Sequence, residues 1–394
     1  MRIAYLHWGF PPIIGGVETH LTILLAELVK KGHQIGLLTG SAPNTKVRYK
    51  FEGFEVFRSP LFDLNWLARR GAESLDEELN KVYKKFFDTV KPDVIHAHNM
   101  HYFSTVHAKL LDQWAVKKGV PLVLTAHNVW DDIQFLKLTR DIKWDHIVAV
   151  SHYIKKELMG VGYPENKITV IHHGIDINNF SPVPPSTEIY EKHPQLKGRK
   201  VVFHPARLGL AKGCDVSIKA IKLVREKIPD VVLVLAGTKN IIDWKMSQEK
   251  DIAYVVDLVK IFNLRDNVYI NFFSLEDMPE IYRASDICIY PSTASEPFGL
   301  TMLEALASGK PMIVTNMGGM PEIIRDDIDG FIVKVKDYEI LASRITQLLL
   351  DDELRARLGK TGRQTVQTHY TKEIMTDCHE KLYKEILTGV EAIV

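Results

Sequence analysis

Two glutamates eight positions apart, in the segment Glu296-Pro-Phe-Gly-Leu-Thr-Met-Leu-Glu304, are candidates for binding a polar ligand. The segment predicts a loop to Gly299 and then a helix that ends in a left-handed cap at Gly309. Because most of that helix is apolar, we expect it to be buried, with its few polar residues on one face. Open amides at a helix start bind anions, and a buried carboxylate requires hydrogen-bond donors. The segment therefore suits a sugar nucleotide, although a polar stripe that faces water has the same spacing.

Two cations, Arg207 and Lys212, follow a predicted strand at residues 200–206 and precede a predicted helix. Cations in a loop at the carboxyl end of a parallel strand can neutralise a diphosphate. Two solvated surface cations are the alternative. Because this loop and the Glu296 segment both follow strands of the same half, we expect them to face one pocket.

The first half carries a paired glycine, Gly15-Gly16, and several histidines near predicted strand ends. The glycines lack the GxGxxG spacing of a nicotinamide site but allow a ligand to approach the backbone; a plain tight turn is the alternative. His127 directly follows a predicted strand, which makes it a catalytic candidate, with a core histidine as the alternative. His96 and His98 could share one strand face. Neither has a nearby carboxylate or cysteine to complete a zinc site, so no metal is predicted.

A second possible metal motif is Asp327 with Asp329, a minimal DxD pattern. The pair lies in a turn-like stretch between a predicted helix and a predicted strand. We expect a solvated turn there.

The elements that must position these residues are short apolar strands alternating with amphipathic helices. The expected strands are residues 3–8, 34–39, 94–97, 122–126, 146–150, 200–206, 231–236, 268–272, 287–290, 312–315 and 331–333. The expected helices include residues 17–31, 75–90, 103–118, 152–159 and 214–227. The series predicts an α/β protein with two Rossmann-like parallel-sheet domains facing an interdomain cleft. The predicted domains are 1–176 and 199–371, joined by a proline-rich linker at 177–198.

Composition narrows the class of protein. The chain has 394 residues, a net charge of +1 and 46% hydrophobic residues, which favours two globular domains and excludes a strongly basic nucleic-acid-binding protein. Its three scattered cysteines favour a reducing cytoplasm. No apolar run is long enough to span a membrane. Three lysines and two phenylalanines could touch an anionic surface at the inner face of a membrane, but we expect a helix with a basic outer face instead. These residues are Lys81, Lys84, Lys85, Phe86 and Phe87.

Taken together, these segments resemble the retaining glycosyltransferases of family 4, which have the GT-B architecture. The resemblance covers nearly the whole chain, and it is specific because of the order and spacing of the motifs. The motifs are Gly15-Gly16-Val-Glu18, Asp93-Val-Ile-His-Ala-His98, Thr125-Ala-His-Asn128, Val170-Ile-His-His-Gly-Ile-Asp176 with Phe180-Ser-Pro182, Arg207 with Lys212-Gly213 and Asp215, Glu296 with Glu304, and Gly318-Gly319-Met-Pro-Glu322.

The resemblance implies a role for each site residue. Arg207 and Lys212 would bind the donor diphosphate, Glu296 would face the donor sugar, and Glu304 would bond the ribose hydroxyls. His127 would lie near the reacting centre. Further donor contacts would come from Gly16 and from the backbone amides of Phe298, Gly299 and Leu300. A last helix, within residues 372–394, would pack back on the first domain.

The implied activity is transfer of a hexosyl group from a nucleotide-diphosphate sugar to an acceptor hydroxyl, with an α-linked product. The acceptor would be a sugar, a cyclitol or a glycolipid, and neither metal nor cofactor would be required. The nucleobase stays open, because Phe273-Ser274 replaces a frequent glycine of the base-binding loop. A sugar-nucleotide epimerase and a non-catalytic nucleotide-sugar binding protein are the alternatives. Aromatic and polar residues expected near the acceptor are His7, Trp8, His101, Tyr102, Phe103 and Trp130.

Overall fold

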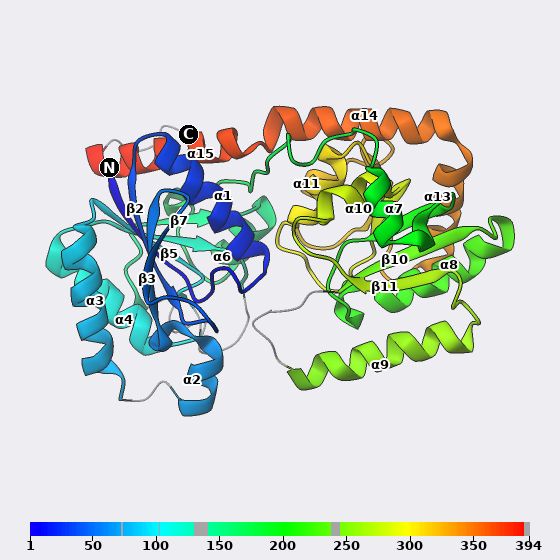
Figure 1. The fold of residues 1–394 in the computed structure, drawn as a ribbon. Helices are drawn as coiled ribbons and strands as arrows, with labels where there is room; N and C mark the ends of the chain where they lie inside the picture. Colours follow the sequence, from blue (N-terminus) through cyan, green and yellow to red (C-terminus); the bar gives the residue numbers. More distant parts are fainter. Residues whose placement is uncertain (72–73, 102, 130–140, 238–244, 390–394) are drawn as a thin grey trace. The chain divides into compact units, whose positions relative to one another are not determined.

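The computed structural model describes residues 1–71, 74–101, 103–129, 141–237 and 245–389, which form two compact units (Figure 1). Unit 1 contains Met1–His173 and the C-terminal helix α15. Unit 2 contains the described residues between Gly174 and Thr371. Each unit is built on its own largely or entirely parallel sheet, so the predicted pair of parallel-sheet α/β domains is confirmed.

The sheet of unit 1 has the strand order β3-β4-β2-β1-β5-β6-β7-β8. Its pairs are parallel except for β3 with β4, which is antiparallel. The strands are β1 (Arg2–Leu6), β2 (Gln34–Gly40), β3 (Arg48–Phe51), β4 (Phe54–Ser59), β5 (Val94–His98), β6 (Leu122–Ala126), β7 (His146–Ala149) and β8 (Ile168–Val170). The helices are α1 (Gly16–Lys30), η1 (Pro60–Phe62), α2 (Leu64–Arg70), α3 (Asp76–Val90), α4 (Thr105–Lys118), α6 (His152–Gly160), η2 (Glu165–Lys167) and α15 (Lys372–Thr388).

Helix α15 packs on unit 1 through side chains on one face. Tyr383 is fully buried, and its hydroxyl lies 2.6 Å from His96 Nδ1 on β5. At the edge of the contact, Lys31 Nζ lies 2.6 Å from a carboxylate oxygen of Asp377. Helix α15 therefore belongs to the same core as the strands at the centre of the sheet.

The sheet of unit 2 has the strand order β11-β10-β9-β12-β13-β14, and its pairs are parallel. The strands are β9 (Lys200–His204), β10 (Val231–Gly237), β11 (Val268–Phe272), β12 (Ile287–Tyr290), β13 (Met312–Thr315) and β14 (Gly330–Val333). The helices are α7 (Thr187–Lys192), η3 (Pro194–Leu196), η4 (Leu210–Lys212), α8 (Cys214–Lys227), α9 (Lys245–Ile261), α10 (Met278–Ala284), α11 (Leu300–Ala307), α12 (Met320–Ile323), α13 (Tyr338–Leu350) and α14 (Asp352–His369).

The apolar runs became strands because both faces of each central strand are covered. All seven residues of β10, for example, are buried, as a strand between two helical layers requires.

The sequence prediction missed β3, β4 and β8. The first two form an edge hairpin in which β3 alternates exposed with half-buried residues, so it lacks a continuous apolar run. The helix predicted from residue 103 begins instead at Thr105.

Candidate functional site

In each sheet, the first strand of the unit lies at a switch point in strand order. Strand β1 lies between β2 and β5, and β9 lies between β10 and β12. Open parallel sheets bind ligands at the carboxyl ends of strands next to such a point. The loops that follow these strands carry the predicted site residues: Arg207 and Lys212 after β9, Glu296 after β12, Gly16 after β1 and His127 after β6.

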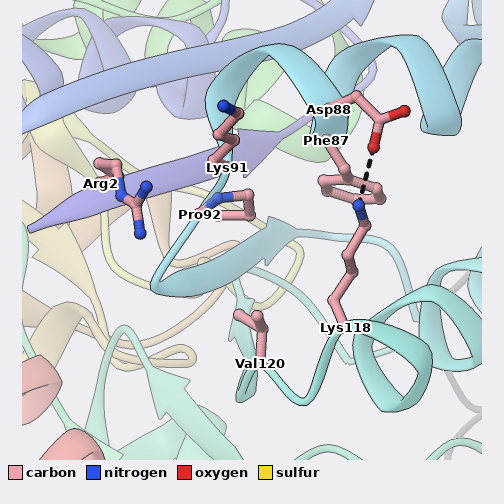
Figure 2. A pocket seen from close by; sticks show the side chains of 7 residues that line it. All are labelled: Arg2, Phe87, Asp88, Lys91, Pro92, Lys118 and Val120. Carbon is pink, nitrogen blue, oxygen red and sulfur yellow. Dashed lines mark hydrogen bonds and ion pairs between the residues drawn. The ribbon is translucent and has the colours of Figure 1, made fainter.

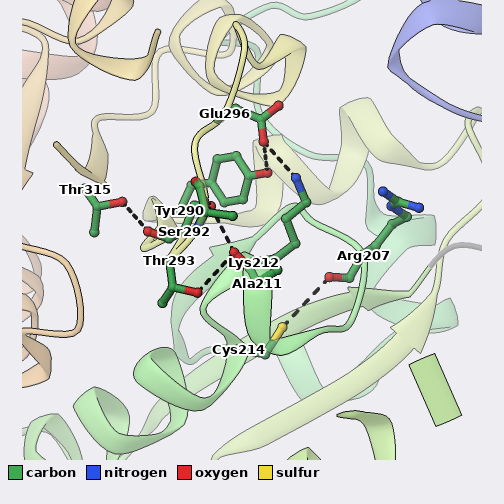
Figure 3. Close-up of polar contacts among 10 residues, drawn as sticks. Arg207, Ala211, Lys212, Cys214, Tyr290, Ser292, Thr293, Glu296 and Thr315 are labelled. Atoms are coloured by element: carbon green, nitrogen blue, oxygen red, sulfur yellow. Dashed lines mark hydrogen bonds and ion pairs between the residues drawn. The ribbon is translucent and has the colours of Figure 1, made fainter. Parts of the chain in front are cut away.

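In unit 2, hydrogen bonds tie the loop after β9 to the loop after β12 (Figure 3). The Ser292 hydroxyl and the Thr293 N–H each donate to the Ala211 carbonyl at 3.0 Å. The Thr293 hydroxyl donates to the Leu210 carbonyl at 3.0 Å, and Thr315 donates to the Ser292 carbonyl at 2.6 Å. These bonds hold Lys212 and Glu296, one on each loop, in a fixed relative position.

Lys212, Glu296 and Tyr290 form a contact group at the centre of Figure 3. Glu296 Oε2 lies 2.7 Å from Lys212 Nζ and accepts a hydrogen bond from the Tyr290 hydroxyl at 2.6 Å. The Lys212 ammonium also lies 5.5 Å from the centre of the Tyr290 ring. The Glu296 side chain is 15% exposed and that of Lys212 26%, so both remain accessible to a ligand.

The charges around Glu296 keep it ionised. Burial raises the pKa of this carboxyl, but the charge of Lys212, hydrogen bonds from Lys212 and Tyr290, and the charge of Arg207 together bring it below its ordinary value. Arg207 itself is exposed. The structure thus brings together two predicted cations and one predicted carboxylate at the carboxyl ends of β9 and β12.

Two glycines allow the backbone around Glu296 to adopt this arrangement. The Gly319 N–H donates to the Glu296 carbonyl at 2.7 Å. Gly318 has a φ of +59°, and a Cβ on it would overlap the Glu296 carbonyl and lie 2.7 Å from the Glu296 nitrogen. Gly213 has a φ of +79°, and a Cβ there would overlap the Pro291 carbonyl. A side chain at Gly318 would push the loop after β13 away from Glu296, and one at Gly213 would push the loop after β9 away from Pro291.

Helix α11 begins and ends as its glycines predict. Gly299 precedes the helix with a φ of +99°, and Gly309 follows it with a φ of +71°. Because Gly299 has no side chain to act as a cap, the helix start presents backbone amides. Phe298 and Leu300 are buried beside it, and the Phe298 ring packs against Tyr370 at 5.9 Å between centroids.

Glu304 lies on α11, where it contacts a tyrosine of α10. The Tyr282 hydroxyl donates to Glu304 Oε2 at 2.8 Å and contacts the Thr301 carbonyl at 3.3 Å. Burial raises the pKa of Glu304 to about 7, although the hydrogen bond from Tyr282 opposes the shift. This carboxyl is therefore half-protonated near neutral pH, unlike Glu296.

In unit 1, His127 lies in a buried group of histidines. Its Nε2 is 2.8 Å from His98 Nδ1, and its backbone N–H donates to Asn99 Oδ1 at 2.9 Å. The rings of His20 and His173 lie 5.3 and 5.1 Å from the His127 ring. Burial, and then the nearby imidazoles, lower the pKa of His127 well below its ordinary value, so the ring is neutral. His127 is only 4% exposed, as the alternative of a core histidine also requires.

Three of these histidines come close enough to be considered as metal ligands. Nitrogen atoms of His20, His98 and His127 all lie within 4.8 Å of one another. Two nitrogens on one tetrahedral zinc would be about 3.3 Å apart, given zinc–nitrogen bonds of about 2.05 Å. The 2.8 Å separation of His98 Nδ1 and His127 Nε2 is shorter and is that of a direct hydrogen bond. The arrangement favours a hydrogen-bonded pair.

The DxD residues do not converge. The Asp327 side chain is 72% exposed, as expected for a solvated turn. The expectation is wrong for Asp329, which is fully buried and accepts hydrogen bonds from Arg325 at 2.6 and 2.8 Å. The second aspartate is therefore a structural ion-pair partner.

Gly15 and Gly16 differ in their surroundings. A Cβ on Gly15 would overlap the carboxylate of Glu18, which is buried and lies 3.0 Å from His7 Nε2. A Cβ on Gly16 would meet no atom of the described chain within 4 Å, and its φ is not in the left-handed region. Packing within the chain accounts for Gly15, whereas Gly16 borders open space.

The predicted acceptor surface is partly wrong. His7, Trp8 and His101 are buried, and Trp8 donates from its indole nitrogen to the Asn99 carbonyl at 3.1 Å. These three side chains therefore support the strand ends from within the core. Phe103 is 36% exposed and remains a candidate. Tyr102 and Trp130 lie outside the described residues.

On α3 the structure agrees with the expected helix with a basic outer face and not with a membrane-facing patch. Phe86 and Phe87 are buried against the sheet and cannot insert into a lipid surface. Lys81, Lys84 and Lys85 are exposed, so this face of the helix is basic without being apolar. Among the described residues, no helix combines the length and the apolar content needed to cross a membrane.

A separate cavity of about 400 Å³ lies at the amino ends of strands in unit 1 (Figure 2). Arg2 begins β1, while Pro92 and Val120 precede β5 and β6, which places the cavity away from the edge that carries His127. Two of its cations form ion pairs, Arg2 with Asp93 at 2.6 Å and Lys118 with Asp88 at 2.8 Å. We do not assign it to the candidate site.

Sequence reasoning missed the two tyrosines that contact the glutamates. Tyr290 ends β12, so its place at the carboxyl end of a strand was a signal that could have identified it. Tyr282 lies 22 residues before Glu304 on another helix, and nothing in the local pattern indicates their contact.

Two family models match the chain. The model described as Glycosyltransferase Family 4 matches residues 14–179, and the one described as Glycosyl transferases group 1 matches residues 185–365. An uncharacterized glycosyltransferase of Methanocaldococcus jannaschii is 26% identical to this chain over 98% of both sequences.

Two solved structures share the fold over almost the whole chain. A glycosyltransferase from Rickettsia africae has a TM-score of 0.80 and 22% identity, covering 98% of each chain. HepE of Anabaena, solved with UDP and glucose, has a TM-score of 0.77 and 20% identity, covering 98% of this chain and 99% of its own.

Proposed function

Since this chain belongs to glycosyltransferase family 4, with the GT-B architecture, we propose that it is a retaining hexosyltransferase that uses a nucleotide-diphosphate sugar. The acceptor is a hydroxyl group of a sugar, a cyclitol or a glycolipid, and the product is α-linked. The observation that carries the proposal is the group formed by Lys212 and Glu296, with Arg207 close enough to lower the pKa of Glu296.

The donor diphosphate is bound by Arg207, Lys212 and the backbone amides of Phe298, Gly299 and Leu300. A similar protein, HepE, was solved with UDP and glucose, which supports a nucleotide sugar as the ligand class. Glu296 accepts hydrogen bonds from hydroxyls of the transferred sugar, and Glu304 accepts them from the ribose. In the unliganded chain, Lys212 is paired with Glu296, so the diphosphate competes for an ammonium that is already in place.

The reaction breaks the bond between the anomeric carbon and the donor phosphate oxygen and forms a bond to the acceptor oxygen on the same face. The departing phosphate oxygen takes the acceptor proton. Negative charge grows on the diphosphate as the bond breaks, and preorganised cations and amides stabilise it. The two cations and the amides serve in place of a bound metal ion. His127, held neutral, makes a hydrogen bond at the reacting sugar, and Gly16 allows the diphosphate to approach the backbone.

The test is a donor screen followed by site variants. Thermal unfolding is measured with UDP, GDP and ADP sugars, and the stabilising donor is then offered to sugar, cyclitol and glycolipid acceptors. We expect Lys212→Ala and Glu296→Ala to lower kcat/KM on the order of 100-fold or more, equivalent to about 3 kcal/mol of transition-state stabilisation. The matched control is Lys260→Ala, which removes an exposed lysine paired with Asp257 on α9. Turnover near wild type in either site variant contradicts the proposal.

A further inference from the structure

Each donor-facing glutamate contacts one buried tyrosine hydroxyl from a neighbouring element. Tyr290 ends β12 and donates to Glu296 Oε2 at 2.6 Å, while Tyr282 on α10 donates to Glu304 Oε2 at 2.8 Å. Tyr290 is 4% exposed and Tyr282 is fully buried. Both hydroxyls therefore come from rigid parts of the fold and not from mobile surface side chains.

The tyrosine rings are held by packing on other aromatic residues. Tyr282 lies between Phe203 and Phe180, with ring centroids 5.1 and 5.7 Å away. Tyr290 packs against His204 at 5.9 Å. Rings fixed in this way direct their hydroxyls to one point, so each carboxylate is oriented without having to adjust when a ligand arrives.

The contacts on Glu296 fall on one oxygen. Among the described residues, Tyr290 and Lys212 both contact Oε2, and Figure 3 shows the second oxygen pointing away from them. When a diphosphate draws Lys212 toward its own charge, the hydroxyl of Tyr290 is the contact that stays on the carboxylate. Glu296 can then keep its orientation and present the second oxygen to the sugar.

We propose that Tyr290 and Tyr282 are positioning residues of the donor site, Tyr290 for the transferred sugar and Tyr282 for the ribose. The inference rests on the proposed function. It goes further because it predicts that the same change, Tyr→Phe, has different effects at the two positions. At Tyr290 it acts on the sugar end of the donor, and at Tyr282 on the nucleotide end. Loss of Tyr290 weakens catalysis, whereas loss of Tyr282 weakens binding of the nucleotide.

The experiment compares Tyr290→Phe, Tyr282→Phe and a matched control, Tyr83→Phe. Tyr83 is fully buried in unit 1, where its hydroxyl donates to the His107 carbonyl at 3.1 Å. UDP, GDP and ADP, each without sugar, are titrated calorimetrically to give Kd, and kcat is measured at saturating nucleotide sugar. Circular dichroism and thermal unfolding establish that each variant is folded.

Tyr290→Phe should lower kcat about 10-fold or more while the Kd of the nucleoside diphosphate stays within about 3-fold of wild type, as loss of a hydrogen bond to a charged acceptor predicts. Tyr282→Phe should weaken that Kd about 10-fold with kcat at saturation largely kept. Tyr83→Phe should lower only the Tm. In a Glu296→Ala background, which removes the acceptor, Tyr290→Phe should have no further effect, because Tyr290 acts through the Glu296 carboxylate.

The inference is overturned if the two site variants have the same kinetic profile, or if either differs from wild type only in Tm. It is also overturned if Tyr290→Phe has its full effect in the Glu296→Ala background. A wild-type protein that neither binds a nucleoside diphosphate nor transfers sugar would refute the proposed function instead. Activity in the wild type with no effect of either Tyr→Phe change refutes this inference alone.

Discussion

Mild acid should unfold unit 1 before unit 2, because neutral buried histidines are concentrated in unit 1. Burial lowers the pKa of His101, His107 and His379 to about 4 and that of His173 to about 3. Burial also lowers the pKa of four more histidines of unit 1 well below the ordinary value. These histidines are His20, His96, His98 and His127. Among the described residues of unit 2, burial lowers the pKa of His204 to about 3 and that of His193 below 6.5.

The direction follows from proton linkage. The unfolded chain binds protons at histidines near pH 6.5, whereas the folded unit does not bind them until the pH approaches 4. The stability that these residues provide is therefore complete above about pH 7 and is lost as the pH falls from 6.5 towards 4. At pH 5.5 each such histidine costs about 1.4 kcal/mol, so the first four alone cost about 6 kcal/mol. That loss is comparable with the whole stability of a typical domain, about 5–15 kcal/mol.

The assay follows each unit separately between pH 8 and pH 4. Tryptophan fluorescence of a Trp244→Phe variant reports on unit 1, because the other five tryptophans belong to that unit and Trp8, Trp114 and Trp144 are buried there. Hydrogen exchange of peptides from β9 to β14 reports on unit 2. We expect fluorescence to change at a higher pH than that at which the unit 2 amides lose protection, and with uptake of several protons.

A single substitution provides the control. His379 is buried on α15, where its Nδ1 contacts the Met375 carbonyl at 2.9 Å. His379→Leu should reduce the pH dependence of unfolding by one proton, or about 1.4 kcal/mol per pH unit. Loss of structure in both units at the same pH, or uptake of no more than one proton by unit 1, would refute the reasoning.

Three further predictions concern unit 2 and the reaction. Because the folded pKa of Glu304 is about 7, its neutral form stabilises the fold below pH 4.5 and this contribution is lost as the pH rises to about 7. Glu304→Gln should therefore be more stable than wild type at pH 8 by up to about 3 kcal/mol in urea unfolding, and equal stability there contradicts the shift. Gly318→Ala should lower the Tm and the activity because its Cβ overlaps the Glu296 backbone, whereas Gly16→Ala, which meets no atom within 4 Å, should keep the wild-type Tm; a reversed order would disprove the steric argument. Sugar transfer should keep its full rate in excess EDTA, and a rate restored by Mn²⁺ would contradict the mechanism. The first product should be an α anomer by NMR, and a β anomer would also contradict the mechanism.

The site could be predicted from sequence as far as local rules reach. Gly299 and Gly309 were expected to border a buried helix, and both have the positive φ that such positions favour. Arg207, Lys212 and Glu296 were expected at strand ends because apolar runs precede them. Strand β12 ends where its run ends, whereas β9 ends at His204, before the end of the predicted run at residue 206. The prediction failed where exposure depends on neighbours: Trp8 was expected at a surface but is buried against Phe62 and His107, which lie far away in the sequence.

The sequence by itself therefore determined the class of fold and the positions of the site residues along it. Apolar periodicity, glycine conformation and the parallel connection of β-α units act over a few residues, so they can be inferred without coordinates. Only the tertiary structure decided which side chains touch. Lys212 contacts Glu296 across 84 residues, and Tyr383 of the last helix contacts His96 across 287. Such contacts depend on how strands order in a sheet and how loops pack at its edge, which no local pattern encodes.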